Sequence, residues 1–252
     1  MTGFGYVLQG LRLMWRPGIR RFTLIPLAIN LLLFGAGTWA LIHYAQHMLN
    51  QLLPDWLNWL SWLLLPVLFI GLLLMAFFSF TLVANFIAAP FNALLAQKIE
   101  FELTGEATPE DNTALWPLAV KTLAAEWRKF RYFLSYAIPL ALLWFVPGLN
   151  LLAPFLWFAF SAWMMALQYI DAPAGNHLWE FEAQRRWLQT MPVTSLTFGA
   201  TMTGMTLVPV LNLLALPVGV CAATALWVNK KSARNAFARD NPKGLIVRRT
   251  GQ

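Results

Sequence analysis

The chain has 252 residues, which would suit one or two soluble domains, but its composition argues against a soluble fold. Charged residues make up 12% of the chain, against roughly 25% in ordinary globular proteins. Hydrophobic residues make up 59%, and the mean hydropathy is +0.57. The apolar content excludes disorder, and the single cysteine, Cys221, excludes a disulfide scaffold. What remains is an integral membrane protein or a protein that buries itself in a partner.

The 18 basic and 11 acidic residues leave four long uncharged stretches, at 22–54, 56–97, 132–170 and 187–229. A membrane-spanning helix needs roughly 20 apolar residues, and the shortest of these stretches has 33. Each stretch is therefore long enough to cross a membrane at least once. This pattern predicts one all-α membrane domain over residues 1–229.

The first half of the chain is predicted to hold an amphipathic helix and two spanning helices. Apolar residues recur at helical spacing over 4–15, which is typical of a helix lying on a membrane surface. Three tryptophans within 56–62 are typical of a membrane interface between two spanning helices. The expected segments are an amphipathic helix with an arginine turn (1–21), spanning helices (22–47 and 63–89) and a cytoplasmic helical region (90–131).

The third and fourth stretches are both interrupted by the phrase Val-Pro-x-Leu-Asn-Leu-Leu-Ala, at 146–153 and 208–215. The apolar arm before each break has 15 residues, so it reaches only about 22 Å of the roughly 30 Å hydrocarbon core. We expect two helical hairpins, 132–170 and 193–229, that insert part-way. Four short, tilted spanning helices are the alternative. The hairpin tips would hold Pro147, Asn150, Pro209 and Asn212.

The distribution of basic residues predicts the orientation. The expected outer loop has no lysine or arginine, whereas all basic residues lie at or before Arg21, in 98–131, in 171–186 or after Val228. Two spanning helices and two hairpins put these regions on one side, which the positive-inside rule makes cytoplasmic. Both termini would then be cytoplasmic. This one-sided distribution of basic residues accounts for the net charge of +7, so we expect no nucleic-acid partner.

The last segment, 230–252, carries seven basic residues and one acid. We expect it to be a solvated, partly disordered cytoplasmic tail that touches anionic headgroups.

The most suggestive polar group is Pro17-Gly18-Ile19-Arg20-Arg21, at the turn into the first spanning helix. A glycine turn and a helix N-terminus expose backbone N–H groups, and the helix dipole there favours an anion. Arginine adds a fork of donors suited to a tetrahedral oxyanion. The alternative is that these arginines are ordinary flanking residues of a spanning helix without a ligand.

Polar residues at membrane depth, and charges at its cytoplasmic edge, form a second candidate group. They could line an ion path or hydrogen-bond between helices. No hydrolase, kinase or redox motif and no metal-binding cluster is visible, so we expect no enzyme activity, cofactor or metal. The path candidates are Asn30, Asn85, Asn92, Glu100, Glu102 and Arg128.

Five phrases together resemble a known family in order and spacing. They are Pro-Gly-Ile-Arg-Arg-Phe (17–22), Ile-Ala-Ala-Pro-Phe-Asn-Ala-Leu-Leu-Ala (87–96), Glu-Trp-Arg-Lys-Phe (126–130), Phe-Ser-Ala-Trp-Met (160–164) and Ala-Ala-Thr-Ala-Leu-Trp-Val (222–228). The chain resembles the bacterial inner-membrane sulfate permease family CysZ over most of its length. The basic tail after Trp227 resembles the family least.

The resemblance implies sulfate uptake across the inner membrane to supply cysteine biosynthesis. It also implies a homo-oligomer within the lipid bilayer. Sulfate, with sulfite and related oxyanions as further ligands, would bind at Gly18, Ile19, Arg20 and Arg21. A non-transporting membrane scaffold or a sulfate-sensing regulator is the alternative function.

Overall fold

The structure is a computed structural model that describes residues 1–22, 24–25, 28–29, 32, 35–37, 39, 43, 70–71, 91–107 and 115–241. These residues are largely helical and contain no β-strand, so the prediction of an all-α membrane fold is confirmed. The chain forms two compact units, one from residues 1–20 and 92–252 and the other from residues 21–91.

In the second unit, the described residues between 21 and 43, and residues 70–71, are helical. The tryptophan-rich segment 56–62 lies outside the described residues.

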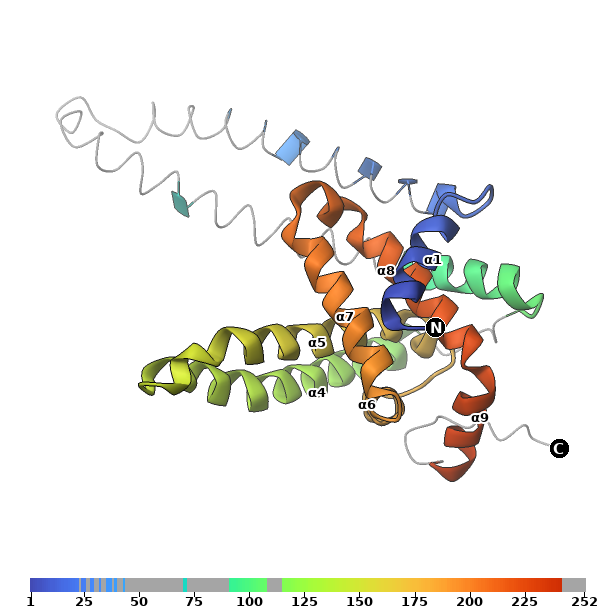
Figure 1. Ribbon diagram of the computed structural model, residues 1–252. Helices are drawn as coiled ribbons and strands as arrows, with labels where there is room; N and C mark the ends of the chain where they lie inside the picture. The colour runs from blue at the N-terminus through green and yellow to red at the C-terminus, as the bar shows by residue number, and fades with distance from the viewer. Residues whose placement is uncertain are drawn as a thin grey trace. The chain divides into compact units, whose positions relative to one another are not determined.

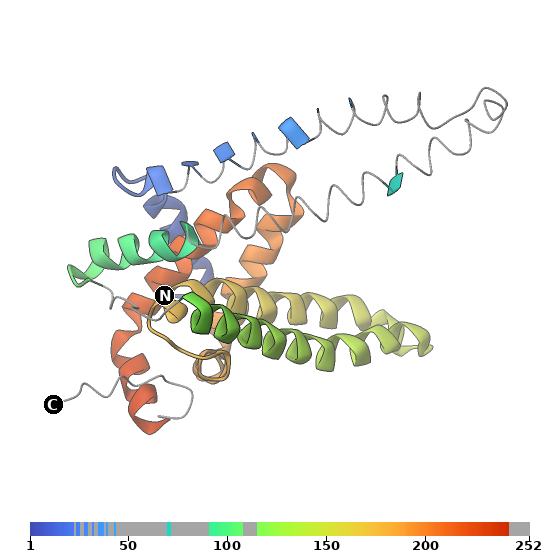
Figure 2. The same cartoon turned by 180° about the vertical axis from the view of Figure 1, so that it is seen from behind.

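The first unit holds the remaining described helices (Figures 1 and 2). Residues 92–104 are helical. The labelled elements are α1 (Gly3–Leu13), α4 (Leu115–Leu142), η2 (Leu143–Phe145), η3 (Leu149–Leu151), α5 (Ala153–Asn176), α6 (Phe181–Gln189), α7 (Pro192–Leu207), α8 (Pro209–Asn229) and α9 (Lys231–Asp240).

Helices α4 and α5 form the first hairpin and run side by side in both views (Figures 1 and 2). The turn between them consists of η2 and η3, and Gly148 adopts φ +84° there. Large apolar side chains at this end are exposed, including Phe145 at 82% and Phe155 at 74%. Such a surface suits hydrocarbon rather than water.

Helices α7 and α8 form the second hairpin, and its break is shorter than the repeated phrase predicts. Only Val208 leaves the helical conformation, and α8 begins at Pro209, where proline is well suited to a first helical position. Pro209 therefore lies next to the break between α7 and α8. Asn212 already lies within the first turn of α8 and donates its N–H to the Val208 carbonyl at 2.8 Å. Pro217 lies inside the helix.

The arms of the two hairpins differ in length and composition. Helix α5 and residues 211–229 of α8 are long and apolar enough to cross a membrane, judged by length and composition. Helix α7 has 16 residues, which reach about 24 Å, less than the roughly 30 Å hydrocarbon core. The expected 15-residue arm before the second break is close to the observed length of α7, whereas the arm before the first break is the end of the 28-residue helix α4.

Small residues allow the helices of this unit to approach closely. A Cβ added to Gly199 of α7 would overlap the backbone carbonyl of Ala162 on α5. A Cβ on Gly10 of α1 would lie 2.7 Å from the Val218 carbonyl oxygen of α8. These glycines fix how near the helix axes come, as is common in membrane bundles.

Helix α1 has one face buried and another exposed, as predicted for an amphipathic helix. Tyr6, Val7 and Leu13 are buried where α1 packs on α7 and α8. The exposed face carries apolar residues at helical spacing, which is the composition expected of a face that meets lipid. These residues are Phe4, Leu8, Leu11 and Trp15.

The start of the basic tail is more ordered than predicted. Residues 231–240 form α9, and Arg234 is only 7% exposed. Its guanidinium lies over the Trp227 ring, 4.2 Å from the ring centroid, and its Nη1 donates to the Trp227 carbonyl at 3.2 Å. The physical reason for the difference is that a basic side chain can be buried where an aromatic face and a carbonyl receive it.

Candidate anion-binding site

The predicted arginine turn is a tight, well-anchored bend between α1 and the next helix. Gly18 adopts φ +94°, a conformation that favours glycine. Ile19 is fully buried, so the residue between the glycine and the arginines is held in the core. Arg20 and Arg21 are both exposed and begin the following helix. The turn thus fixes the backbone from which the two exposed arginine side chains project.

The backbone of the turn is partly engaged. The N–H groups of Ile19 and Arg20 both donate to the Arg16 carbonyl, at 3.1 Å each. These two amides are therefore already satisfied and offer little to an anion. An anion at this turn would therefore be bound chiefly by the guanidinium groups. The sequence analysis expected the backbone N–H groups to contribute as well.

The charge on the arginine turn is not neutralised by a direct ion pair in the described part of the chain. Other cations of the structure do have such partners, for example Lys129 with Asp171 at 2.8 Å and Lys231 with Glu106 at 2.6 Å. An unpaired guanidinium on a fixed backbone is available to bind an oxyanion.

A neighbouring helix brings one acid and one base to the turn. A Cβ added at Gly18 would lie 3.2 Å from Oε1 of Glu102 and 3.9 Å from Cε of Lys98. Glu102, a predicted path residue, therefore lies beside the arginine turn. Its carboxylate opposes an incoming anion, whereas Lys98 favours one.

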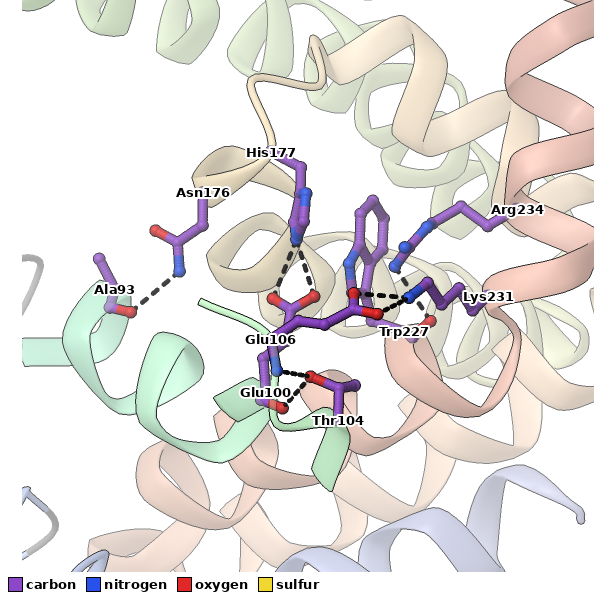
Figure 3. Close-up of polar contacts among 9 residues, drawn as sticks. All are labelled: Ala93, Glu100, Thr104, Glu106, Asn176, His177, Trp227, Lys231 and Arg234. Atoms are coloured by element: carbon purple, nitrogen blue, oxygen red, sulfur yellow. Dashed lines mark hydrogen bonds and ion pairs between the residues drawn. The ribbon is translucent and has the colours of Figure 1, made fainter. Parts of the chain in front are cut away.

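Glu100, another predicted path residue, is buried and paired (Figure 3). Both of its carboxylate oxygens lie 2.9 Å from Nε2 of His177, in the turn that follows α5. The amide of Asn176 donates to the Ala93 carbonyl at 2.9 Å. Together these contacts join helix 92–104 to the end of α5, so Glu100 stabilises the packing of this region.

Helix α9 is attached to the same region through a second acid (Figure 3). Lys231 donates to both carboxylate oxygens of Glu106, at 2.9 and 2.6 Å. The hydrogen bond and charge of Lys231 lower the pKa of Glu106 below its ordinary value. Burial lowers the pKa of Arg234, and the charges of Glu100 and Glu106 oppose that effect.

Arg128 belongs to a different cluster, between α4 and α6. Its Nε lies 3.7 Å from Oε1 of Glu182. Beside it, Lys129 bridges Glu126 of α4 and Asp171 of α5. Within the described residues no ion pair joins Arg128 to Glu100 or Glu102, so the structure does not bring these three candidates together.

The predicted asparagines do not form one lining among the described residues. Asn30 and Asn85 lie outside these residues. Asn92 is half-buried at the start of helix 92–104, and Asn150 and Asn212 are exposed at the two hairpins. The ion path assigned to them therefore stays a prediction.

Sequence reasoning missed the contacts that join distant segments. His177 lies 77 residues from its partner Glu100, and Lys231 lies 125 residues from Glu106. A hydrophobic or polar pattern carries no signal for such pairs. The sequence offers only the opposite charge of two segments, with three acids in 100–106 and three basic residues in 230–234.

A family model, sulfate transporter CysZ/etoposide-induced protein 2.4, matches residues 6–217. The chain belongs to this family. The matched range includes the arginine turn, the first hairpin and most of the second. It ends at Pro217, so the similar phrase at 222–228 and helix α9 lie beyond it. Membership of this family, together with the apolar helices, identifies the chain as a membrane protein of a sulfate-transporter family.

Proposed function

We propose that this protein carries sulfate across the bacterial inner membrane and thereby supplies cysteine biosynthesis. The observation that carries the proposal is the arginine turn, where Arg20 and Arg21 project from a bend fixed by Gly18 and the buried Ile19. Membership of a sulfate-transporter family supports sulfate as the ligand. Sulfite and related oxyanions share the tetrahedral or pyramidal oxygen arrangement and are candidate competitors.

In this proposal the two guanidinium groups bind sulfate by charge-assisted hydrogen bonds. Each such bond contributes roughly 1.5–3 kcal/mol. Calorimetric titration of the purified protein with sulfate tests this step. The Arg20→Ala/Arg21→Ala double variant should bind sulfate at least about tenfold more weakly. Arg12→Ala, which removes an exposed arginine of α1, is the matched control and should bind like the original. Unchanged binding in the double variant overturns the site.

Glu102 gives a second, opposite test of the same site. Its carboxylate lies beside Gly18 and repels a sulfate at the arginine turn. Glu102→Gln should therefore strengthen sulfate binding by a few-fold, and more at low ionic strength, because salt screens the repulsion. Weaker binding would show that Glu102 positions the arginines rather than opposing the anion.

Transport itself is tested with liposomes that contain only this protein. Uptake of radiolabelled sulfate that follows the sulfate gradient, and falls in the Arg20→Ala/Arg21→Ala variant, supports transport. A folded protein that binds sulfate but gives no flux would instead be a scaffold or a sulfate-sensing regulator. Repeating the assay with an imposed pH gradient separates conduction from proton coupling.

Orientation and assembly are part of the same proposal. We expect both termini in the cytoplasm, because the basic residues gather on one side of the predicted topology. Reporter fusions at the two ends should both report a cytoplasmic location. The mass of the detergent-solubilised protein should be a multiple of the 28.5 kDa chain, as expected of a homo-oligomer.

A further inference from the structure

The first hairpin carries an apolar groove along one face, which we call the hairpin groove. It is open to the surroundings along its length and has a volume of about 380 Å³. Residues from α4 form one wall and residues from α5 the other, and Gln189, at the end of α6, also lines it. The wall residues are Tyr132, Tyr136, Leu140, Leu156, Phe160 and Trp163.

The hairpin groove follows the antiparallel pairing of its two helices. At one end Trp163 Nε1 donates to the Tyr132 hydroxyl at 2.9 Å, and in the middle the Tyr136 and Phe160 rings lie 5.9 Å apart. Residues 132–140 of α4 rise by about 12 Å. The groove therefore has a length suited to part of an extended hydrocarbon chain.

The two ends of the hairpin groove differ in polarity. Toward the hairpin tip, the surface beyond Leu140 and Leu156 consists of exposed apolar side chains such as Phe145 and Phe155. Toward the other end, charged residues begin at Arg131, directly before Tyr132. The groove thus runs from a charged zone into an apolar one, as a lipid does from headgroup to tail.

An arginine without an acidic partner in the described chain marks the charged end. The Arg185 guanidinium lies 5.1 Å from the centroid of the Tyr132 ring. Its Nε is buried and has no hydrogen-bond partner. Two nearby cations do pair with acids, Lys129 with Asp171 and Arg128 with Glu182, although the Arg128 Nε also has no hydrogen-bond partner. A buried donor without a partner is unfavourable unless a ligand satisfies it.

We propose that the hairpin groove binds an acyl chain of an anionic phospholipid and that Arg185 binds the phosphate of its headgroup. A free phosphate would satisfy Arg185 but would leave the apolar walls uncovered. A second copy of the chain in the groove would need an acidic side chain to pair with Arg185 on a surface that is otherwise apolar. A phospholipid supplies both chemistries in one molecule, in the order in which the groove presents them.

The assignment of the acyl chain to the groove is tested by substitutions that fill the groove with a larger side chain. The full-length protein is delipidated in detergent, and its binding of phosphatidylglycerol is measured by native mass spectrometry. Leu156→Trp, and Leu140→Trp from the opposite wall, should each weaken this binding at least about tenfold, because the added ring occupies the groove. Leu151→Trp, at an exposed position in η3, is the matched control and should bind normally. Normal binding in both groove variants overturns the proposal.

The headgroup contact is tested with Arg185→Gln and the control Arg239→Gln, an exposed arginine of α9. Arg185→Gln should lose about tenfold in phosphatidylglycerol affinity and should no longer prefer this lipid to phosphatidylcholine. Displacement of the lipid by glycerol 3-phosphate at equal concentration would show that only the phosphate is bound, and would overturn the acyl-chain assignment. A change of oligomeric mass in the groove variants, with lipid binding intact, would assign the groove to a second copy and overturn the proposal.

Discussion

The two hairpins begin from the same sequence phrase and at first follow the same path. Val146 has φ −98° and ψ 112°, and Val208 has φ −99° and ψ 114°. Each valine N–H donates to the carbonyl three residues earlier at 3.3 Å, and the N–H of Asn150 and Asn212 donates back to the valine carbonyl. The phrase itself therefore encodes the break in both places.

The hairpins diverge at the position where the two copies of the phrase differ. Gly148 adopts φ +84°, whereas its counterpart Val210 continues as helix. A β-branched residue is strongly disfavoured at positive φ, so the second copy resumes a helix at once. The first copy instead forms a wider turn with two short 3₁₀ segments. One residue thus decides whether the phrase makes a turn or a one-residue break.

Packing reinforces the difference. Helices α7 and α8 contact α5 and α1 over much of their length, while the tip of the first hairpin exposes Phe145 and Leu151. We therefore expect substitutions in the second hairpin to affect the stability of the protein more than those at the first tip.

The largest effect is expected at Gly199 in the second hairpin. Gly199→Ala places a Cβ on the Ala162 carbonyl and forces α7 away from α5. We expect a loss of about 3 kcal/mol or more, a fall of roughly 6 °C or more in the unfolding midpoint. The measurement is thermal unfolding in detergent, followed by tryptophan fluorescence.

Gly204→Ala is the matched control for Gly199→Ala. It makes the same change in the same helix, where a Cβ would meet no atom within 4 Å. It should leave stability unchanged or raise it by up to about 1 kcal/mol. Equal losses for both variants would contradict the close packing of α7 on α5.

A smaller effect is expected from exchanging the residue that distinguishes the two phrases. Gly148→Val forces a β-branched residue to positive φ and should cost about 1–3 kcal/mol. The same unfolding assay measures it, with Leu151→Val at the same turn as the control. If Gly148→Val is as stable as the control, Gly148 does not decide the form of the turn.

The ion pair that joins the two arms of the first hairpin should contribute less. Lys129 is largely buried and bridges Asp171 and Glu126. Although burial alone would lower the pKa of Lys129, attraction to these two acids raises it above the ordinary value. Lys129→Met should cost about 1–2 kcal/mol because it leaves Asp171 without its cation. Glu126→Gln, at the more exposed partner, should cost less than about 0.5 kcal/mol.

The smallest effect concerns pH at α9, outside both hairpins. Lys231 lowers the pKa of Glu106 from its ordinary value of 4.5. The contact therefore stabilises α9 above that pH, and its contribution is lost as the pH falls through the lowered value. Amide hydrogen exchange in residues 231–240 should increase under those acidic conditions. Glu106→Gln should remove this dependence. An identical pH response in this variant would show that another group is responsible.

The fold class, the amphipathic first helix and the two breaks could all be predicted, because each depends on local patterns of apolar residues, proline and charge. The different widths of the two breaks were harder to predict from the sequence, since they depend on the backbone angle of a single residue, Gly148. The arginine turn could be recognised in the sequence as a motif. The approach of Glu102 to Gly18 and the burial of Arg234 could not be predicted, because both arise from helix packing between distant segments.

The packing of α1 has a consequence for how the protein is made. Gly3 and Gly10 dock α1 against α7 and α8, which are synthesised much later than α1. About 180 residues separate Leu13 from Pro192, so at 5–20 residues per second α1 waits roughly 10–40 s for its partners. Its exposed stripe of Phe4, Leu8, Leu11 and Trp15 would let it bind the membrane surface during this interval. The packing of α1 on α7 and α8 would then form only after this second hairpin has been made.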